Sequence, residues 1–61
     1  MKTIITINMD NAAFVNEDEL PRILNKLAKD ISDCKVGNKY PLYDSNGNSV
    51  GNIVYVYDEE N

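Results

Sequence analysis

The hydrophobic positions of this chain form two β-type patterns separated by one helical pattern. Residues 3–9 alternate with period two and are rich in β-branched side chains, which predicts a strand. Residues 40–43 and 53–57 are also β-type and lie on either side of a polar turn segment. In the first strand, Ile5, Ile7 and Met9 share one face, and Ile4, Thr6 and Asn8 share the other.

Between these strands, the spacing predicts an amphipathic helix from Glu19 to about Asp33. Asp18 is the expected N-cap, with Pro21 in the first turn, where its missing N–H needs no partner. Asn16, three residues before Glu19, is an alternative cap. The apolar stripe of this helix comprises Leu20, Ile23, Leu24, Leu27, Ala28 and Ile31.

The polar segment between the last two strands contains Asn46-Gly47, which is a strong signal for a β-hairpin. A two-residue type I′ turn requires positive φ at both central positions, and Asn and Gly tolerate this best. We therefore expect a two-residue loop, which sets the register of the hairpin. The expected pairs are Tyr43 with Val50, Leu42 with Gly51, and Tyr40 with Ile53.

Pro41 determines the expected strand order. Proline cannot donate to a sheet ladder, so the strand at 40–43 should lie at an edge. The strand at 53–57 then lies in the middle and the first strand at the far edge, in the spatial order one-three-two. We predict a single α+β domain over residues 1–61, with β-α-β-β topology and an acidic tail at 58–61.

One helix can cover one face of such a sheet, so an apolar face is left uncovered. Gly51 opposite Leu42 makes room for a closely packed helix, which predicts that Leu42, Ile53 and Tyr55 face the core together with Ile5 and Ile7. The uncovered face is then the candidate partner-binding surface. It comprises Ile4, Thr6, Tyr43, Val50, Val54 and Val56. If the faces are exchanged, the uncovered patch is the tyrosine-rich one.

Composition narrows the choice of function. A 61-residue chain buries only about 60% of its unfolded surface, and a single cysteine excludes an internal disulfide. We therefore expect self-association, with a homodimer as the simplest form. The net charge of −4 argues against a nucleic-acid partner. The lone cysteine, together with the lack of an export signal or membrane-length apolar run, predicts a cytoplasmic protein without membrane contact.

The residues give little sign of catalytic chemistry. There is no histidine, the commonest general base. Cys34 beside Lys35 is the one alternative nucleophile. The segment that begins at Asp44 resembles a calcium loop, but its glycine falls at the fourth position and its twelfth residue is Tyr55. We predict no enzyme activity, no cofactor and no metal site.

Two clusters of charged residues suggest alternative hypotheses for the function. Glu17, Asp18 and Glu19 form the acidic start of the helix, and they are the secondary candidate for partner binding, by mimicking a nucleic acid. A basic stripe on the outer helix face comprises Arg22, Lys26 and Lys29. This stripe supports the alternative hypothesis of a small nucleic-acid-linked regulatory protein.

Three elements together resemble a group of very short bacteriophage and prophage proteins, mostly without assigned function. They are Asp10-Asn11-Ala12-Ala13-Phe14, the helix with Leu20 and Ile23-Leu24, and the run from Asp44 to Gly51. The resemblance implies a phage accessory protein that acts in the host bacterial cytoplasm by stoichiometric binding. Its target would be a host antiviral defence complex, for example a CRISPR effector. The last strand of the group usually has a charged outer face, whereas this chain has Val54 and Val56 there, which favours a contact.

Overall fold

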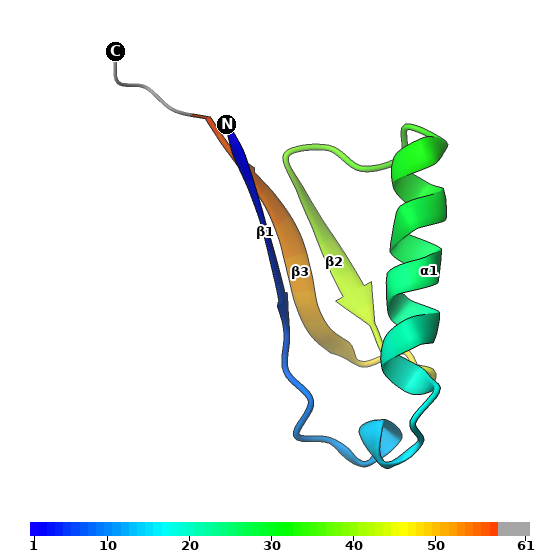
Figure 1. The fold of residues 1–61 in the computed structure, drawn as a ribbon. Coiled ribbons are helices and arrows are strands. Elements are labelled where there is room, and N and C mark those ends of the chain that lie inside the picture. Colours follow the sequence, from blue (N-terminus) through cyan, green and yellow to red (C-terminus); the bar gives the residue numbers. More distant parts are fainter. Residues whose placement is uncertain (58–61) are drawn as a thin grey trace.

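The computed structural model describes residues 1–57 and has the predicted α+β architecture (Figure 1). One helix packs on a three-stranded antiparallel sheet with the order β1-β3-β2. The predicted acidic tail at 58–61 lies outside the described residues. The elements are β1 (Lys2–Ile7), the 3-10 helix η1 (Ala12–Val15), α1 (Glu19–Ser32), β2 (Lys39–Tyr43) and β3 (Ser49–Val56).

Helix α1 begins where the sequence predicts, and both candidate caps take part. Asp18 occupies the N-cap position, but its side chain makes no capping hydrogen bond. Instead, the backbone N–H of Asp18 donates to Asn16 Oδ1 at 2.9 Å. The N–H of Glu19 donates to the backbone oxygen of Asn16 at 3.1 Å. Asn16 therefore closes the turn that leads into the helix.

The helix ends in a Schellman motif centred on Cys34. The N–H of Cys34 donates to Ile31 O at 3.0 Å, and the N–H of Lys35 donates to Asp30 O at 2.9 Å. Cys34 has φ of 60°, so the lone cysteine occupies the left-handed position that glycine usually takes. A glycine in the loop after the helix is the residue that the sequence would favour for positive φ, but Gly37 does not have it, and the reversal is made at Cys34.

The hairpin turn has three residues rather than the predicted two. Asp44 N–H donates to Asn48 O at 2.9 Å, and Gly47 N–H donates to Asp44 O at 3.0 Å. Gly47 has φ of 84°, whereas Asn46 does not have positive φ. These features describe a type I turn followed by a left-handed glycine, the usual three-residue hairpin loop.

The longer turn changes the register at one position and moves Val50 to the other face. Leu42 pairs with Gly51, as predicted, but Tyr43 pairs with Ser49, with a bulge at this step. Val50 is the extra residue of β3, and its side chain is buried in the core. The prediction that Val50 lines the uncovered face is therefore wrong.

The core lies between α1 and the face of the sheet that carries Leu42 and Ile53, as predicted. Ile53 is fully buried, and Phe14 packs against the cluster at the open end of the core. The buried apolar side chains are Ile23, Leu27, Leu42, Val50 and Ile53. Partly buried residues around them are Ile7, Phe14, Val36, Tyr40 and Tyr55.

Gly51 allows a close approach, but the approaching segment is β1 and not the helix. A Cβ atom at Gly51 would lie 1.8 Å from the backbone oxygen of Thr6 and 3.0 Å from Ile7 Cα. Ile7 is the β1 partner of Gly51 in the ladder. The absent side chain therefore lets the end of β1 pass close to β3 beside the bulge at Val50.

Helix α1 is rotated toward β2, which leaves β1 partly uncovered even on the helix side. Figure 1 shows α1 alongside β2, with β3 between β2 and β1. Ile5 points to the same face as its partner Ile53 but is 46% exposed, so its expected place in the core is not realised. Leu24 and Ile31, on the helix flank away from the edge of β2, are also exposed.

Candidate functional site

The sheet face opposite α1 carries an exposed apolar row, and we call this surface the open face. The ladder places Ile4 beside Val54, and Thr6 beside Asn52, with Val56 one step further along β3. Side chains alternate along a strand, so these residues point away from the face that carries Ile53. Ile4 is 44% exposed and Val56 is 39% exposed, while Val54 is half-buried. The open face comprises Ile4, Thr6, Asn52, Val54 and Val56.

Two lysines border the apolar row at one end. Lys2 pairs with Val56 on one side of β3, and Lys39 pairs with Val54 on the other side. Both lysines are exposed and point to the open face. The sequence analysis missed them, although the expected pairing of Tyr40 with Ile53 implies that Lys39 lies beside Val54. The position of Lys2 follows only from the β1–β3 register of the structure. An apolar centre with a cationic border suits a partner surface of apolar and acidic groups.

The remaining predicted site residues lie elsewhere. Tyr43 is 51% exposed, at the end of β2, and lines a groove between the outer edge of β2 and α1. The other residues that line this groove are Ile23, Lys26, Leu27, Asp30, Tyr40, Pro41 and Leu42. The structure therefore brings together Ile4, Thr6, Val54 and Val56, places Tyr43 apart from them at the end of β2, and buries Val50.

Glu19, one of the three acidic residues at the start of α1, is structural. Its side chain is 5% exposed and forms an ion pair of 3.0 Å with Arg22. Its Oε2 also accepts a hydrogen bond of 2.7 Å from the backbone N–H of Ser45 in the hairpin turn. The hydrogen bond from Arg22 lowers the pKa of Glu19. Glu17 and Asp18 are exposed, so two of the three predicted residues are available for contact.

Asp44 holds the hairpin turn and links it to the loop after β1. Its Oδ1 accepts backbone hydrogen bonds from Asn46 at 2.9 Å and Asn48 at 2.8 Å. Its Oδ2 accepts a bond of 2.8 Å from Asn11 Nδ2. The backbone bond from Asn48 is the largest cause of the lowered pKa of Asp44. Asn11 also caps η1, since its Oδ1 accepts the N–H of Ala13.

The hydrogen bond between Asn11 and Asp44 joins two segments that are far apart in the sequence. The two residues are 33 positions apart, and each also accepts hydrogen bonds from its own segment. The two side chains therefore serve the fold of this chain.

Asp30 is the third buried carboxylate, and it joins α1 to β2. Its Oδ2 accepts a hydrogen bond of 2.6 Å from the hydroxyl of Tyr40 and one of 3.1 Å from Lys26 Nζ. The bond from Tyr40 is the largest cause of the lowered pKa of Asp30, and the same bond raises the pKa of Tyr40. This contact draws the helix toward β2, which accounts for its rotation away from β1.

The three buried carboxylates predict a loss of stability in acid. Their pKa values are lower in the folded chain than the ordinary 4.5 of Glu19 and 3.8 of Asp30 and Asp44. A lowered folded pKa stabilises the fold above the unfolded pKa, and this stabilisation is lost as the pH falls through the folded value. The free energy of unfolding, measured by denaturant titration, should therefore be level near neutral pH and fall progressively below about pH 5.

A pair of variants tests the origin of this acid sensitivity. Asp44→Asn should lower the free energy of unfolding at neutral pH and flatten its decline in acid. Glu17→Gln, which changes an exposed carboxylate in the turn before α1, is the matched control and should change the free energy of unfolding at neutral pH less than Asp44→Asn does. An identical acid decline in Asp44→Asn and in the parent chain would contradict the assigned role of Asp44.

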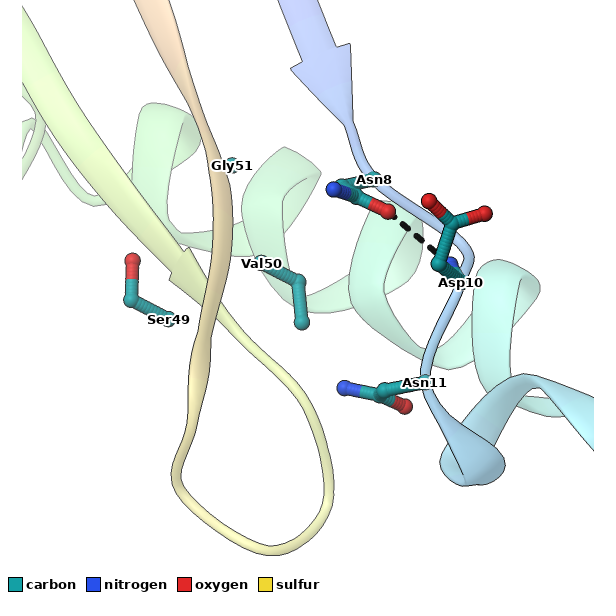
Figure 2. A pocket seen from close by; sticks show the side chains of 6 residues that line it. All are labelled: Asn8, Asp10, Asn11, Ser49, Val50 and Gly51. Carbon is teal, nitrogen blue, oxygen red and sulfur yellow. Dashed lines mark hydrogen bonds between the residues drawn. The ribbon is translucent and has the colours of Figure 1, made fainter.

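A shallow hollow lies where β1 ends beside the bulge of β3 (Figure 2). Asn8 Oδ1 accepts the N–H of Asp10 at 2.9 Å. The oxygen and nitrogen of the Asn11 side chain are both hydrogen-bonded to other parts of this chain. The side chains of Asn8 and Asn11 thus serve local structure, and Asp10 is the single carboxylate in the lining of the hollow. The lining residues are Asn8, Asp10, Asn11, Ser49, Val50 and Gly51.

The basic stripe of α1 is neutralised by neighbouring carboxylates. Lys26 pairs with Asp30 and Lys29 with Asp33, each at 3.1 Å, and Arg22 pairs with Glu19. Arg22 Nη2 also donates to Tyr43 O at 3.2 Å. A phosphate would have to compete with these carboxylates, which weakens the nucleic-acid alternative.

Comparisons with protein-family models, curated proteins and solved structures find no match to this chain. Within residues 1–57, α1 is too short and too polar to cross a membrane. The same residues contain no group of three cysteine, aspartate or glutamate side chains placed to hold a metal ion. The functional argument therefore rests on the surface of the chain itself.

Proposed function

We propose that this chain is a non-enzymatic binding protein whose open face docks on another protein and inhibits it. The observation that carries the proposal is the apolar row on the uncovered side of the sheet, in which Ile4 and Val56 are exposed and Val54 between them is half-buried. Such a row, bordered by polar and charged groups, is typical of a protein–protein contact. The lysines at its border favour a partner surface that has carboxylates around an apolar centre.

The state of the ionisable groups supports a binding role over catalysis. Each described carboxylate whose pKa is lowered accepts hydrogen bonds from other parts of the same chain. These hydrogen bonds stabilise the ionised form of Glu19, Asp30 and Asp44, and they hold the helix, hairpin and loop together. A general acid or base works best with a pKa raised or lowered toward neutral pH, whereas these three groups are shifted away from it.

The resemblance to short phage proteins makes an antiviral defence complex the first class of target to test, and a CRISPR effector complex is the first example. We further propose that the acting species is a homodimer. Within the described residues, five apolar side chains are buried, which is a small core for an independent domain. Association would add buried apolar surface to it.

The docking proposal is tested with a single charge on the open face. Val54→Glu should weaken binding to the target at least about tenfold, because a carboxylate would be buried in an apolar contact. Val15→Glu is the matched control, since Val15 is 85% exposed in η1 and is not part of the open face. Binding of each purified chain to a purified CRISPR effector complex is measured by titration calorimetry. Phage plating on cells that carry the same complex gives the inhibition readout.

The outcomes test the docking surface and the identity of the target separately. Loss of binding in Val54→Glu, with binding retained in Val15→Glu, supports the open face. Equal binding by both variants would contradict it. If the parent chain neither binds effector complexes nor restores phage plating, the choice of a CRISPR complex as the target is wrong.

A further inference from the structure

The outer edge of β1 is an unprotected edge of the sheet. β1 pairs with β3 along one side and has no strand on its other side among the described residues (Figure 1). β1 begins with the charged Lys2, and its other residues, Thr-Ile-Ile-Thr-Ile, include no proline, no glycine and no charge. Edge strands of this kind are templates for pairing with another strand.

The other edge of the sheet is blocked by Pro41 in the middle of β2, because proline lacks an N–H. Lys39 adds a charge at the first position of β2, as Lys2 does on β1. Proline within a strand is one of the usual means by which natural sheets block an edge. One open and one blocked edge allow a closed dimer, whereas two open edges would allow a growing fibre.

The ladder shows which groups of β1 face outward. Asn8 N–H donates to Val50 O at 2.7 Å, so Asn8 directs its backbone groups toward β3. Along an antiparallel strand, this direction alternates from one residue to the next. The N–H and C=O groups of Thr3, Ile5 and Ile7 therefore point to the outer edge.

We propose that β1 pairs through this edge with β1 of a second copy of the chain, antiparallel and with Ile5 opposite the partner's Ile5. Thr3 then lies opposite the partner's Ile7, and the reverse pair is formed by symmetry. All three outward-facing residues of each strand meet outward-facing residues of the other strand. This register forms a continuous six-stranded sheet about a twofold axis, and it deepens the homodimer part of the proposed function.

The side chains also suit a second copy. Ile5 is 46% exposed on the helix side of the sheet, where α1 does not cover β1, and the pairing would place the two Ile5 side chains together. On the open face, Ile4 would lie opposite the partner's Thr6. Lys2 would lie opposite the partner's Asn8, so that no like charges meet directly.

This arrangement leaves both open faces available. The twofold axis runs perpendicular to the sheet, which places both α1 helices on one side and both open faces on the other. The dimer would therefore present two adjacent apolar rows to a target. The dimer contact and the target contact are different surfaces, and they can be tested separately.

Ile5→Pro tests the edge directly. The N–H of Ile5 points outward, so proline at this position removes a donor from the dimer contact without removing one from the pairing with β3. Sedimentation equilibrium should show a dimer for the parent chain and at least about tenfold weaker dimerisation for Ile5→Pro. Circular dichroism should show that Ile5→Pro is folded. A parent chain that sediments at 6.9 kDa at all concentrations would overturn the proposal.

A second variant keeps the test decisive if the proline disturbs β1. Ile5→Lys places two ammonium groups together at the twofold axis and should also give a monomer. Val54→Lys is the matched control on the open face, because Val54 lies on the central strand β3 and not at the β1 edge. It should leave the dimer intact, while it weakens target binding. Dimers that withstand Ile5→Lys but dissociate in Val54→Lys would show that the copies meet through the open face, and would contradict pairing at the β1 edge.

The register is tested by cross-linking in a Cys34→Ser background. Directly opposed residues of a hydrogen-bonded pair have Cα atoms about 5.5 Å apart, within the range that a disulfide spans. Ile5→Cys should therefore form a covalent dimer on oxidation. Ile7→Cys lies opposite the partner's Thr3, so it should remain largely uncross-linked. Equal cross-linking of both variants would contradict the register.

Discussion

Replacement of Gly51 by alanine is expected to cost about 3 kcal/mol or more of folding free energy, which is at the severe end for one substitution. The added Cβ would lie 1.8 Å from Thr6 O, and the nearest atoms belong to the backbone of β1 rather than to a flexible side chain. β1 would have to move away from β3 at the point where Ile7 pairs with Gly51. Chemical denaturation followed by circular dichroism measures the loss.

Gly37→Ala is the matched control for this prediction. A Cβ at Gly37 meets no heavy atom within 4 Å, and Gly37 does not have positive φ. Alanine there should be neutral or stabilise the chain by up to about 1 kcal/mol, through the reduced entropy of the unfolded state. A loss for Gly51→Ala no larger than the change for Gly37→Ala would mean that β1 does not approach β3 as described.

Truncation of Ile53 is expected to cost about 2–5 kcal/mol, the range observed for Ile→Ala in cores. Ile53 is fully buried in the middle of the central strand and is part of the core between the sheet and α1. A domain of this size has a total stability of roughly 3–9 kcal/mol, from about 0.05–0.15 kcal/mol per residue. Ile53→Ala should therefore remove a large part of the total stability, and the thermal unfolding midpoint should fall clearly.

Ile31→Ala is the control for the core prediction. Ile31 has the same side chain but is 41% exposed on α1, and alanine is favourable in a helix. Its substitution should cost less than about 1 kcal/mol. Similar losses for Ile53→Ala and Ile31→Ala would contradict the placement of the core.

The sequence predicts the architecture because two features of the residues are unambiguous. The apolar spacing from Leu20 to Ile31 allows one helix, and Pro41 places its strand at an edge of the sheet. The strand order β1-β3-β2 follows from that single proline and is confirmed. The covered face is also confirmed, since Leu42 and Ile53 are buried.

The prediction for Val50 is wrong because it depends on the Asn46-Gly47 pair alone and not on the wider turn segment. Asn-Gly favours a two-residue loop. The wider segment, however, has aspartate at 44 and glycine at 47, and these residue types are favoured at the first and fourth positions of a type I turn. The side chain of Asp44 accepts two backbone hydrogen bonds that close this longer turn. One added loop residue produces the bulge and moves Val50 into the core.

The rotation of α1 could not be predicted from its apolar stripe. The stripe includes Leu24 and Ile31, but the buried face instead includes Asp30, which binds the hydroxyl of Tyr40. A polar contact between residues on different elements thus prevails over part of the hydrophobic pattern. Because α1 lies closer to β2 than to β1, Ile5 is exposed, and the period-two pattern of β1 alone does not predict this.

The most direct test of the account is the solvent exposure of the open face in the isolated chain. Paramagnetic relaxation of methyl NMR signals by a soluble nitroxide reports this exposure residue by residue. The account predicts strong relaxation of the Val54 and Val56 methyl groups, even in a dimer joined through β1, and weak relaxation of those of Ile53 and Leu27. Methyl groups of Val54 and Val56 that are as protected as those of Ile53 would show that the open face is covered and would contradict the account.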